Sequence, residues 1–360
     1  MRAWKLVLAA ACCLAATNAR ALDSCSCRNL ESLQQELENA VYEAKFFADL
    51  SKRLDDTEKK QADINKNDPT NPDAGRLVNQ VSAEARKAIM AKEFKPPHRK
   101  VTGYTGPDTV DMEQDTCTQD QRMLDAMRDG SPCREIADIT LEHEATHRRL
   151  CQSMGVDAYW ARLPSLVAAE EAERYKAQAD AMRKVLKKVI DDGTITIESV
   201  MEPRLKGPQF DVTYSYVMPK VELQGKSSPG PDSWTLKGKG KQAGTIKQMK
   251  VAGMSCKASG QLNDNMSLSF ETDGLGMSLD IANVSTTGDI YIKCKGGFGQ
   301  SMRPQGEAGS GTAFSGERLK NSSELVVPVA GMTFAKMIAQ AGLSVSGEHK
   351  TTVTLVCPGF

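Results

Sequence analysis

Glu142-His143-Glu144-Ala145-Thr146-His147 contains the pattern HExxH, in which one helix face offers a metal ion two imidazoles and a nearby carboxylate. Residues four apart lie one above the other on a helix, so His143 and His147 can face a single Zn²⁺ ion. Glu144, one position round the helix, can then reach a water molecule at the metal. The motif uses two of the four histidines in the chain, which makes coincidence a poor explanation. The alternative is a surface helix whose two histidines are solvated or cap a neighbouring loop.

Helix start and stop signals flank the motif. Ser131-Pro132 stands at the predicted start of its helix, and Gly155 stands where a left-handed residue commonly ends one. A turn is predicted through residues 156–163. Pro164 then occupies the first turn of a second helix, which Gly193 closes.

A third protein ligand is needed beside the two histidines of a catalytic zinc site. Acidic residues of the second helix, in the stretch 170–173, are the candidates. His147 lies seven residues before Met154, and Glu171 lies seven after Pro164. Each is therefore about 10 Å from the connecting turn, given a rise of about 1.5 Å per residue. If the two helices run antiparallel and side by side, these groups come level.

This arrangement, an HExxH helix, a turn and a second helix that gives a glutamate, resembles the gluzincin group of zinc metallopeptidases. Several similar bacterial sequences show a Glu-x-x-Ala-Tyr pattern on the second helix. Here Glu171 and Tyr175 have that spacing, with Arg174 in place of the alanine. The spacing favours Glu171 as the third ligand, and the departure keeps Glu170 as an alternative. The resemblance covers about residues 133–178, and no specific family is recognised for the whole chain.

The resemblance implies an exported zinc metallopeptidase that hydrolyses peptide bonds of a peptide or protein substrate. Its ligands would be His143, His147 and Glu171, and Glu144 would act as the general base toward water. Tyr175, one turn beyond Glu171, could donate a hydrogen bond to the oxyanion. The other interpretation of Tyr175 is a buried tyrosine that fills the space between helices.

His98, in a proline-rich segment, could face the same cleft, but it is interpreted as a surface histidine outside the site.

The rival to a peptidase is a non-catalytic, disulfide-braced envelope or binding protein, with or without structural zinc, in which HExxH is incidental.

The first 21 residues are typical of a secretory signal peptide. Arg2 and Lys5 give a positive start, an apolar core follows, and Ala19-Arg20-Ala21 is a small-x-small cleavage site. A lipoprotein signal is a minor alternative, since Ala9 before Cys12 matches it poorly. No later segment reaches the roughly 20 apolar residues of a membrane span. We therefore expect a secreted or periplasmic protein with no transmembrane segment.

Eight cysteines remain after the signal, an even number that predicts disulfide bonds in an exported protein. Five precede residue 160 and three follow it, so complete pairing needs at least one bridge between these two parts. Cys133 and Cys151 lie at opposite ends of the motif helix, about 27 Å apart, and cannot pair with each other. Zinc binding by the cysteines is less favoured, because no CxxC pair occurs.

Hydrophobic periodicity divides the mature chain and predicts an α+β fold. Residues 22–193 are predicted to form a mostly helical, metallopeptidase-like domain; its first helix carries a stripe from Leu30 to Leu54. A polar loop is predicted at 63–72 and a second helix at 74–92. The non-helical segment 95–108 contains Val101–Thr105, which fits either an edge strand or a plain loop. Alternating runs over 195–360 predict an all-β, sandwich-like accessory domain.

The charge pattern excludes one class of partner and suggests another. The formal net charge is zero, so no basic field favours nucleic acid. Lys237, Lys239 and Lys241 alternate with glycine in the β half. They could contact an anionic surface, such as acidic glycan or lipid headgroups. The alternative is that they protect an exposed strand edge from pairing with other chains.

Overall fold

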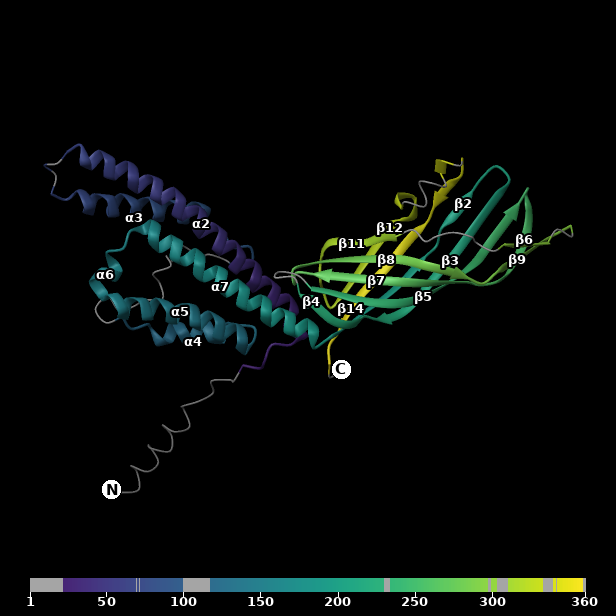
Figure 1. The fold of residues 1–360 in the computed structure, drawn as a ribbon, viewed down its shortest axis with the longest axis horizontal. Helices are drawn as coiled ribbons and strands as arrows, with labels where there is room; N and C mark the ends of the chain where they lie inside the picture. The colour runs from purple at the N-terminus through teal and green to yellow at the C-terminus, as the bar shows by residue number, and fades with distance from the viewer. Residues whose placement is uncertain are drawn as a thin grey trace, which may run out of the picture. The chain divides into compact units, whose positions relative to one another are not determined.

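The structure is a computed structural model that describes residues 22–68, 70, 72–99, 117–229, 234–296, 299–302, 310–332, 339–340 and 342–358 (Figure 1). The chain forms two compact units. The first contains residues 22–25 and 35–185, and the second contains residues 26–34 and everything from residue 186 onward. The predicted signal peptide and the run Val101–Thr105 lie outside the described residues.

The first unit is helical, as predicted. Its helices are α2 (Leu30–Lys66), α3 (Ala74–Glu93), α4 (Gln121–Asp129), α5 (Arg134–Met154), α6 (Val156–Trp160) and α7 (Pro164–Asp191). A short 3-10 turn at Cys27–Asn29, which belongs to the second unit, precedes α2. The division between the units crosses α2 and α7. The motif helix α5 ends at Gly155, whose φ of 86° is a conformation that glycine adopts without strain. Pro164 begins α7, where its missing N–H costs nothing.

Three details of the helical prediction were wrong. Helix α2 continues to Lys66, through the first residues of the stretch 63–72 predicted as a loop. The predicted turn at 156–163 contains the single-turn helix α6. Helix α4 was not predicted; it is short and has no buried residue, so it gives little hydrophobic signal, although Asp120 caps its first turn by accepting from the Arg122 N–H.

The core of the helical unit joins α2, α3 and α7. Phe47, Leu50 and Leu54 of α2 are buried in one cluster with Met90 of α3 and Ala168 of α7. Partly buried aromatic residues extend the cluster, and the rings of Phe47 and Tyr175 stack at 5.6 Å. The later part of the apolar stripe predicted on the first helix, from Phe47 to Leu54, therefore packs against α3 and α7.

The second unit contains a single antiparallel sheet, strongly curved, rather than the predicted pair of sheets. Fourteen strands are seen among the described residues, and all are hydrogen-bonded into this sheet. They are β1 (Thr194–Met201), β2 (Arg204–Lys206), β3 (Phe210–Glu222), β4 (Gln224–Pro229), β5 (Trp234–Val251), β6 (Met254–Gly260), β7 (Leu262–Thr272), β8 (Gly276–Thr287), β9 (Ile290–Cys294), β10 (Gly299–Met302), β11 (Ser310–Arg318), β12 (Ser322–Pro328), β13 (Ser344–Ser346) and β14 (Glu348–Val356). The sandwich prediction failed because alternation identifies strands but not their partners.

Burial alternates along the strands, as a sheet with one packed face requires. In β7, every second residue from Leu262 to Thr272 is buried, including Leu268 and Phe270. The first and last strands of the unit pair with each other, with Ile197 of β1 opposite Val353 of β14. The α+β class predicted from periodicity is confirmed.

Four disulfide bonds join all eight cysteines of the described chain: Cys25–Cys133, Cys27–Cys357, Cys117–Cys151 and Cys256–Cys294. The prediction that at least one bridge crosses residue 160 is confirmed by Cys27–Cys357. Cys133 and Cys151 have different partners, as their positions at the two ends of one helix required. Bridges of this number are typical of proteins from oxidising compartments and fit a secreted or periplasmic protein. Among the described helices, none is both long and apolar enough to cross a membrane.

Strand β5 overturns the edge-protection interpretation of the lysines. On one side Lys237, Lys239 and Lys241 pair with Ser269, Ser267 and Asn265 of β7. On the opposite side β5 pairs with β4 at Trp234, Thr235 and Lys237 and with β3 from Ala243 to Val251, while β6 pairs with the end of β5 on the same side as β7. These lysines are exposed on the outer face of an interior strand, so they guard no free edge.

Candidate metal centre

Three side chains from α5 and α7 converge on one point. Nε2 of His143 lies 3.3 Å from Oε2 of Glu171, and Nε2 of His147 lies 3.1 Å from Oε1 of the same carboxylate. All three side chains are buried, with Glu171 only 2 % exposed. His143 also contacts Gln178, later on α7, whereas His147 contacts the earlier Arg174. The earlier histidine on α5 thus contacts the later residue on α7, and the later histidine contacts the earlier one, so the two helices are antiparallel. This is the arrangement in which the sequence placed His147 and Glu171 at the same level.

The donor set and its spacing fit a metal ion. One donor atom from each of the three residues lies within 4.8 Å of the other two. Donors bound at about 2.1 Å in a tetrahedral zinc site are about 3.4 Å apart, close to the separations seen here. Two imidazoles and one carboxylate are also a ligand combination found in catalytic zinc sites. His143, His147 and Glu171 could therefore hold a metal ion.

Second contacts of the two imidazoles orient their rings. Nδ1 of His143 lies 2.9 Å from Oε1 of Gln178, an acceptor that favours the proton on Nδ1 and leaves Nε2 free to bind a metal. Nδ1 of His147 lies 3.3 Å from the hydroxyl of Tyr159 and 2.5 Å from Nη1 of Arg174. Each ring thus turns Nε2 toward Glu171, while Nδ1 of His143 faces Gln178 and Nδ1 of His147 faces Tyr159 and Arg174.

Charge at the centre is concentrated on Glu171. Burial alone would raise the pKa of this carboxyl, but hydrogen bonds and charge from both histidines hold it far below its usual range. The pKa of His143 is raised: burial lowers it, but the hydrogen bond and charge of Glu171 outweigh that effect. The cluster therefore holds an ionised carboxylate, and a metal must displace any proton on Nε2 before it binds.

Glu144 is buried beside the three residues, with 8 % of its surface exposed. Burial raises the pKa of its carboxyl, and Glu171 adds to the effect, while His143 and His147 oppose it. The backbone carbonyl of Glu144 accepts a hydrogen bond of 2.6 Å from Gln119, which fixes α5 to the segment before α4. A carboxyl whose pKa is shifted toward neutrality is suited to accept and return a proton.

Tyr175 packs against the aromatic core on one side and His143 on the other. Its ring stacks on Phe47 and lies 4.5 Å from the ring of His143. Burial and the nearby carboxylates of Glu43 and Glu171 raise the pKa of its phenol well above the usual value, so the hydroxyl keeps its proton. These contacts favour the packing interpretation, while the role as a hydrogen-bond donor to an oxyanion stays a prediction.

A second buried acid, Glu43, lies near Tyr175. Burial raises the pKa of Glu43 to about 7, although Oε1 lies 3.0 Å from Nη1 of Arg99. Arg99 also pairs with Glu36, and His98 pairs with Glu38. His98 therefore belongs to a set of contacts between residues 98–99 and α2 and lies outside the metal centre, as predicted.

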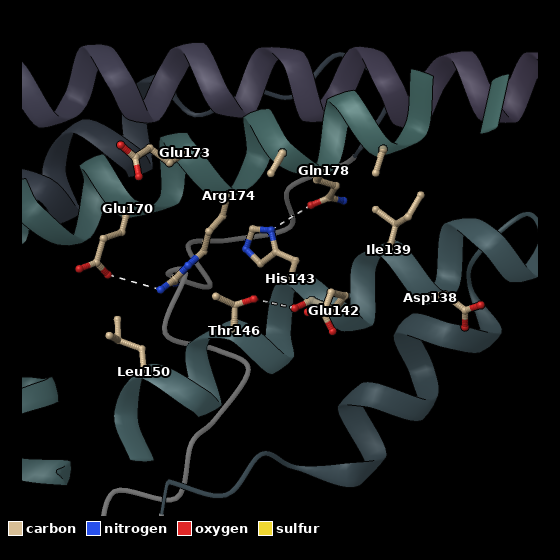
Figure 2. Close-up of a pocket in the computed structure, with 12 residues that line it drawn as sticks. Asp138, Ile139, Glu142, His143, Thr146, Leu150, Glu170, Glu173, Arg174 and Gln178 are labelled. Carbon is tan, nitrogen blue, oxygen red and sulfur yellow. Dashed lines mark hydrogen bonds and ion pairs between the residues drawn. The ribbon is translucent and has the colours of Figure 1, made fainter. Parts of the chain in front are cut away.

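A hollow of about 740 Å³ opens beside His143, between α5 and α7 (Figure 2). Apolar residues such as Ile139, Leu150 and Ala177 line it, together with the carboxylates of Asp138, Glu142, Glu170 and Glu173 and the guanidinium of Arg174. Glu170, the alternative third ligand, is turned away from the histidines. Its Oε2 lies 2.5 Å from Nη1 of Arg162 and 3.5 Å from Nη2 of Arg174.

One other group of potential metal ligands occurs within the described ranges. Cys25, Cys133 and Glu135 are close together, but the two sulfurs form a disulfide bond and so offer no thiolate. The backbone N–H of Cys25 donates to Glu135 at 2.7 Å. This group is structural.

Four residues around the centre were not predicted from the sequence: Gln119, Tyr159, Gln178 and the buried acid Glu43. Only Gln178 had a signal, because it follows Glu171 by seven residues and so lies two turns along on the same helix face. Arg174 was noted as a departure from a pattern, but its contact with His147 was not foreseen.

Comparison of this chain with protein-family models, curated proteins and solved structures gives no match.

Proposed function

We propose that this protein is an exported zinc-dependent metallopeptidase. The observation that carries the proposal is the convergence of His143, His147 and Glu171, at 3.1 and 3.3 Å, beside the buried carboxyl of Glu144. Its supports are a ligand set that suits zinc, a base next to it and a hollow large enough for a peptide side chain. The resemblance to gluzincins supplies the choice of peptide bonds over other amides or esters.

In this proposal the chain's own residues have separate tasks. Zinc, when bound, would polarise the scissile carbonyl and lower the pKa of water. Glu144 takes the proton from the attacking water and passes it to the leaving amine. Gln178 and Tyr159 hold the two imidazole rings through Nδ1, which keeps each Nε2 directed at the centre.

Metal analysis and a hydrolysis assay test this function together. The purified mature protein is expected to contain about one zinc per chain, and His143→Ala is expected to lose it, because two ligands hold zinc poorly. A fluorogenic peptide library should be hydrolysed, the activity should stop with a chelator, and added zinc should restore it. Hydrolysis that persists after zinc is removed would refute the proposed chemistry. Zinc without hydrolysis of any peptide would leave a metal-binding protein, the rival interpretation.

For the β unit, we propose contact with an anionic surface through Lys237, Lys239 and Lys241. The supporting observation is their position on the interior strand β5, which removes edge protection as an explanation. Their neighbours on β7 are the neutral Ser269, Ser267 and Asn265. Side chains two apart on a strand are about 7 Å apart, so the row presents regularly spaced positive charge.

Replacing all three lysines by glutamine is expected to weaken binding to a sulfated polysaccharide column, because the row supplies positive charge that such a polymer requires. The salt concentration at elution should fall. The control replaces Lys59, Lys60 and Lys66 of α2 by glutamine, which removes the same charge elsewhere. Equal elution of the two triple variants would show that only net charge matters. Binding to anionic lipid vesicles but not to the polysaccharide would identify the surface as a membrane.

A further inference from the structure

Arg174 places a permanent positive charge against two of the three candidate ligands. Its Nη1 lies 2.5 Å from Nδ1 and 3.2 Å from Nε2 of His147, and 3.6 Å from Oε1 of Glu171. Only 13 % of its side chain is exposed. A guanidinium does not lose its proton in proteins, and little water surrounds this one, so its charge acts at close range.

The contact with His147 favours a tautomer that a metal would not accept. A guanidinium can only donate hydrogen bonds, so its short contact with Nδ1 needs a lone pair there and the ring proton on Nε2. Metal binding through Nε2 needs the opposite tautomer, with the proton on Nδ1. In that tautomer the hydroxyl of Tyr159, 3.3 Å from Nδ1, is available as the acceptor. Arg174 and a metal ion therefore require different states of His147.

A second position for the guanidinium lies one turn back on the same helix. Nη2 of Arg174 is 3.5 Å from Oε2 of Glu170, and the side chain already points into the hollow between α5 and α7 (Figure 2). Glu173 lines the same hollow. A rotation of the Arg174 side chain toward Glu170, which already pairs with Arg162, would exchange its contacts with His147 and Glu171 for a closer contact with this carboxylate.

We propose that Arg174 sets the metal affinity of the centre by competing with the metal ion for His147 and Glu171. Metal binding then includes the transfer of the guanidinium to Glu170. This inference rests on the metal centre of the proposed function and adds a specific determinant of its affinity. In the resembling sequences an alanine stands at the position of Arg174. Because alanine carries no charge, it does not compete with a metal ion for the two ligands.

Zinc affinity of Arg174→Met tests the proposal, since methionine keeps an unbranched side chain and removes the charge. The full mature protein, oxidised and freed of metal, is titrated with Zn²⁺ against a chromophoric chelator of known affinity. We expect Arg174→Met to bind zinc about 10- to 100-fold more tightly than the unchanged protein, the size of effect that groups around metal ligands have. Arg174→Lys, which keeps a positive charge, should lie much closer to the unchanged protein.

The matched control is Arg183→Met, on the same helix, where the arginine pairs with Asp180 at 2.8 Å away from the centre. Its zinc affinity should not change. Co²⁺ spectra of each variant report whether the same tetrahedral ligands are used, and circular dichroism reports folding independently of metal.

Each outcome decides the inference separately from the proposed function. If Arg174→Met binds zinc no more tightly than the unchanged protein, the competition is wrong while the metal centre stands. If only Arg174→Met binds zinc, the competition is supported in its strongest form and the unchanged chain is not a zinc peptidase. If none of the folded variants binds Zn²⁺ or Co²⁺, both the inference and the centre fall.

Discussion

Glu144→Gln is expected to lower kcat/KM for peptide hydrolysis by about 100- to 10,000-fold, the range that a positioned general base contributes. Glutamine keeps the shape of the side chain but cannot take a proton from water. Because Glu144 is not among the three convergent ligands, zinc should stay bound. Steady-state kinetics on the best substrate of a peptide library, with zinc content measured on the same samples, give both readouts.

The control for this variant is Asp180→Asn, which removes a carboxylate from the exposed surface of α7. Its kinetics and zinc content should match those of the unchanged protein. Glu144→Gln with undiminished turnover would show that another group takes the proton. Loss of zinc together with activity would instead place Glu144 among the ligands and change the assignment of the site.

The local part of the candidate site could be predicted because a helix repeats every 3.6 residues. His143 and His147 face one way for that reason, and the short connection at residues 155–163 forces α7 back alongside α5. Equal distances from the connection then place Glu171 at the level of His147, 3.1 Å away. What spacing could not decide was the rotation of α7, which directs Glu171 to the histidines and Glu170 to Arg162 and Arg174.

Long-range partners could not be predicted from the same signals. The cysteine count required a bridge across residue 160, but nothing in the sequence identified Cys27 and Cys357 as the pair. Alternation located the strands, yet β5 pairs with four other strands, an arrangement that side-chain periodicity does not encode. Glu43 lies on a helix whose apolar stripe was predicted, but its ion pair with Arg99, 56 residues away in the sequence, had no local signal.

Glu171→Gln is expected to weaken zinc binding by more than about 100-fold, beyond the 10- to 100-fold typical of groups behind the ligands. The variant keeps the volume of the side chain at a site that is 2 % exposed, but it removes the negative charge that both histidines and a metal share. Activity should be lost with the metal. Glu170→Gln is the matched comparison, one residue away; it keeps an amide oxygen as an acceptor but removes the negative charge that pairs with Arg162 and Arg174.

We expect Glu170→Gln to keep zinc affinity within about tenfold of the unchanged protein, because changes around metal ligands cost less than loss of a ligand. Chelator competition gives the affinities, and Co²⁺ spectra show whether a carboxylate has left the coordination sphere. The opposite order, with Glu170→Gln the more damaging, would mean that α7 turns Glu170 to the metal in the loaded protein. Equal and small effects of the two substitutions on zinc affinity would show that the centre does not use a carboxylate from α7. The resemblance to gluzincins, which depends on a glutamate ligand from the second helix, would then be wrong.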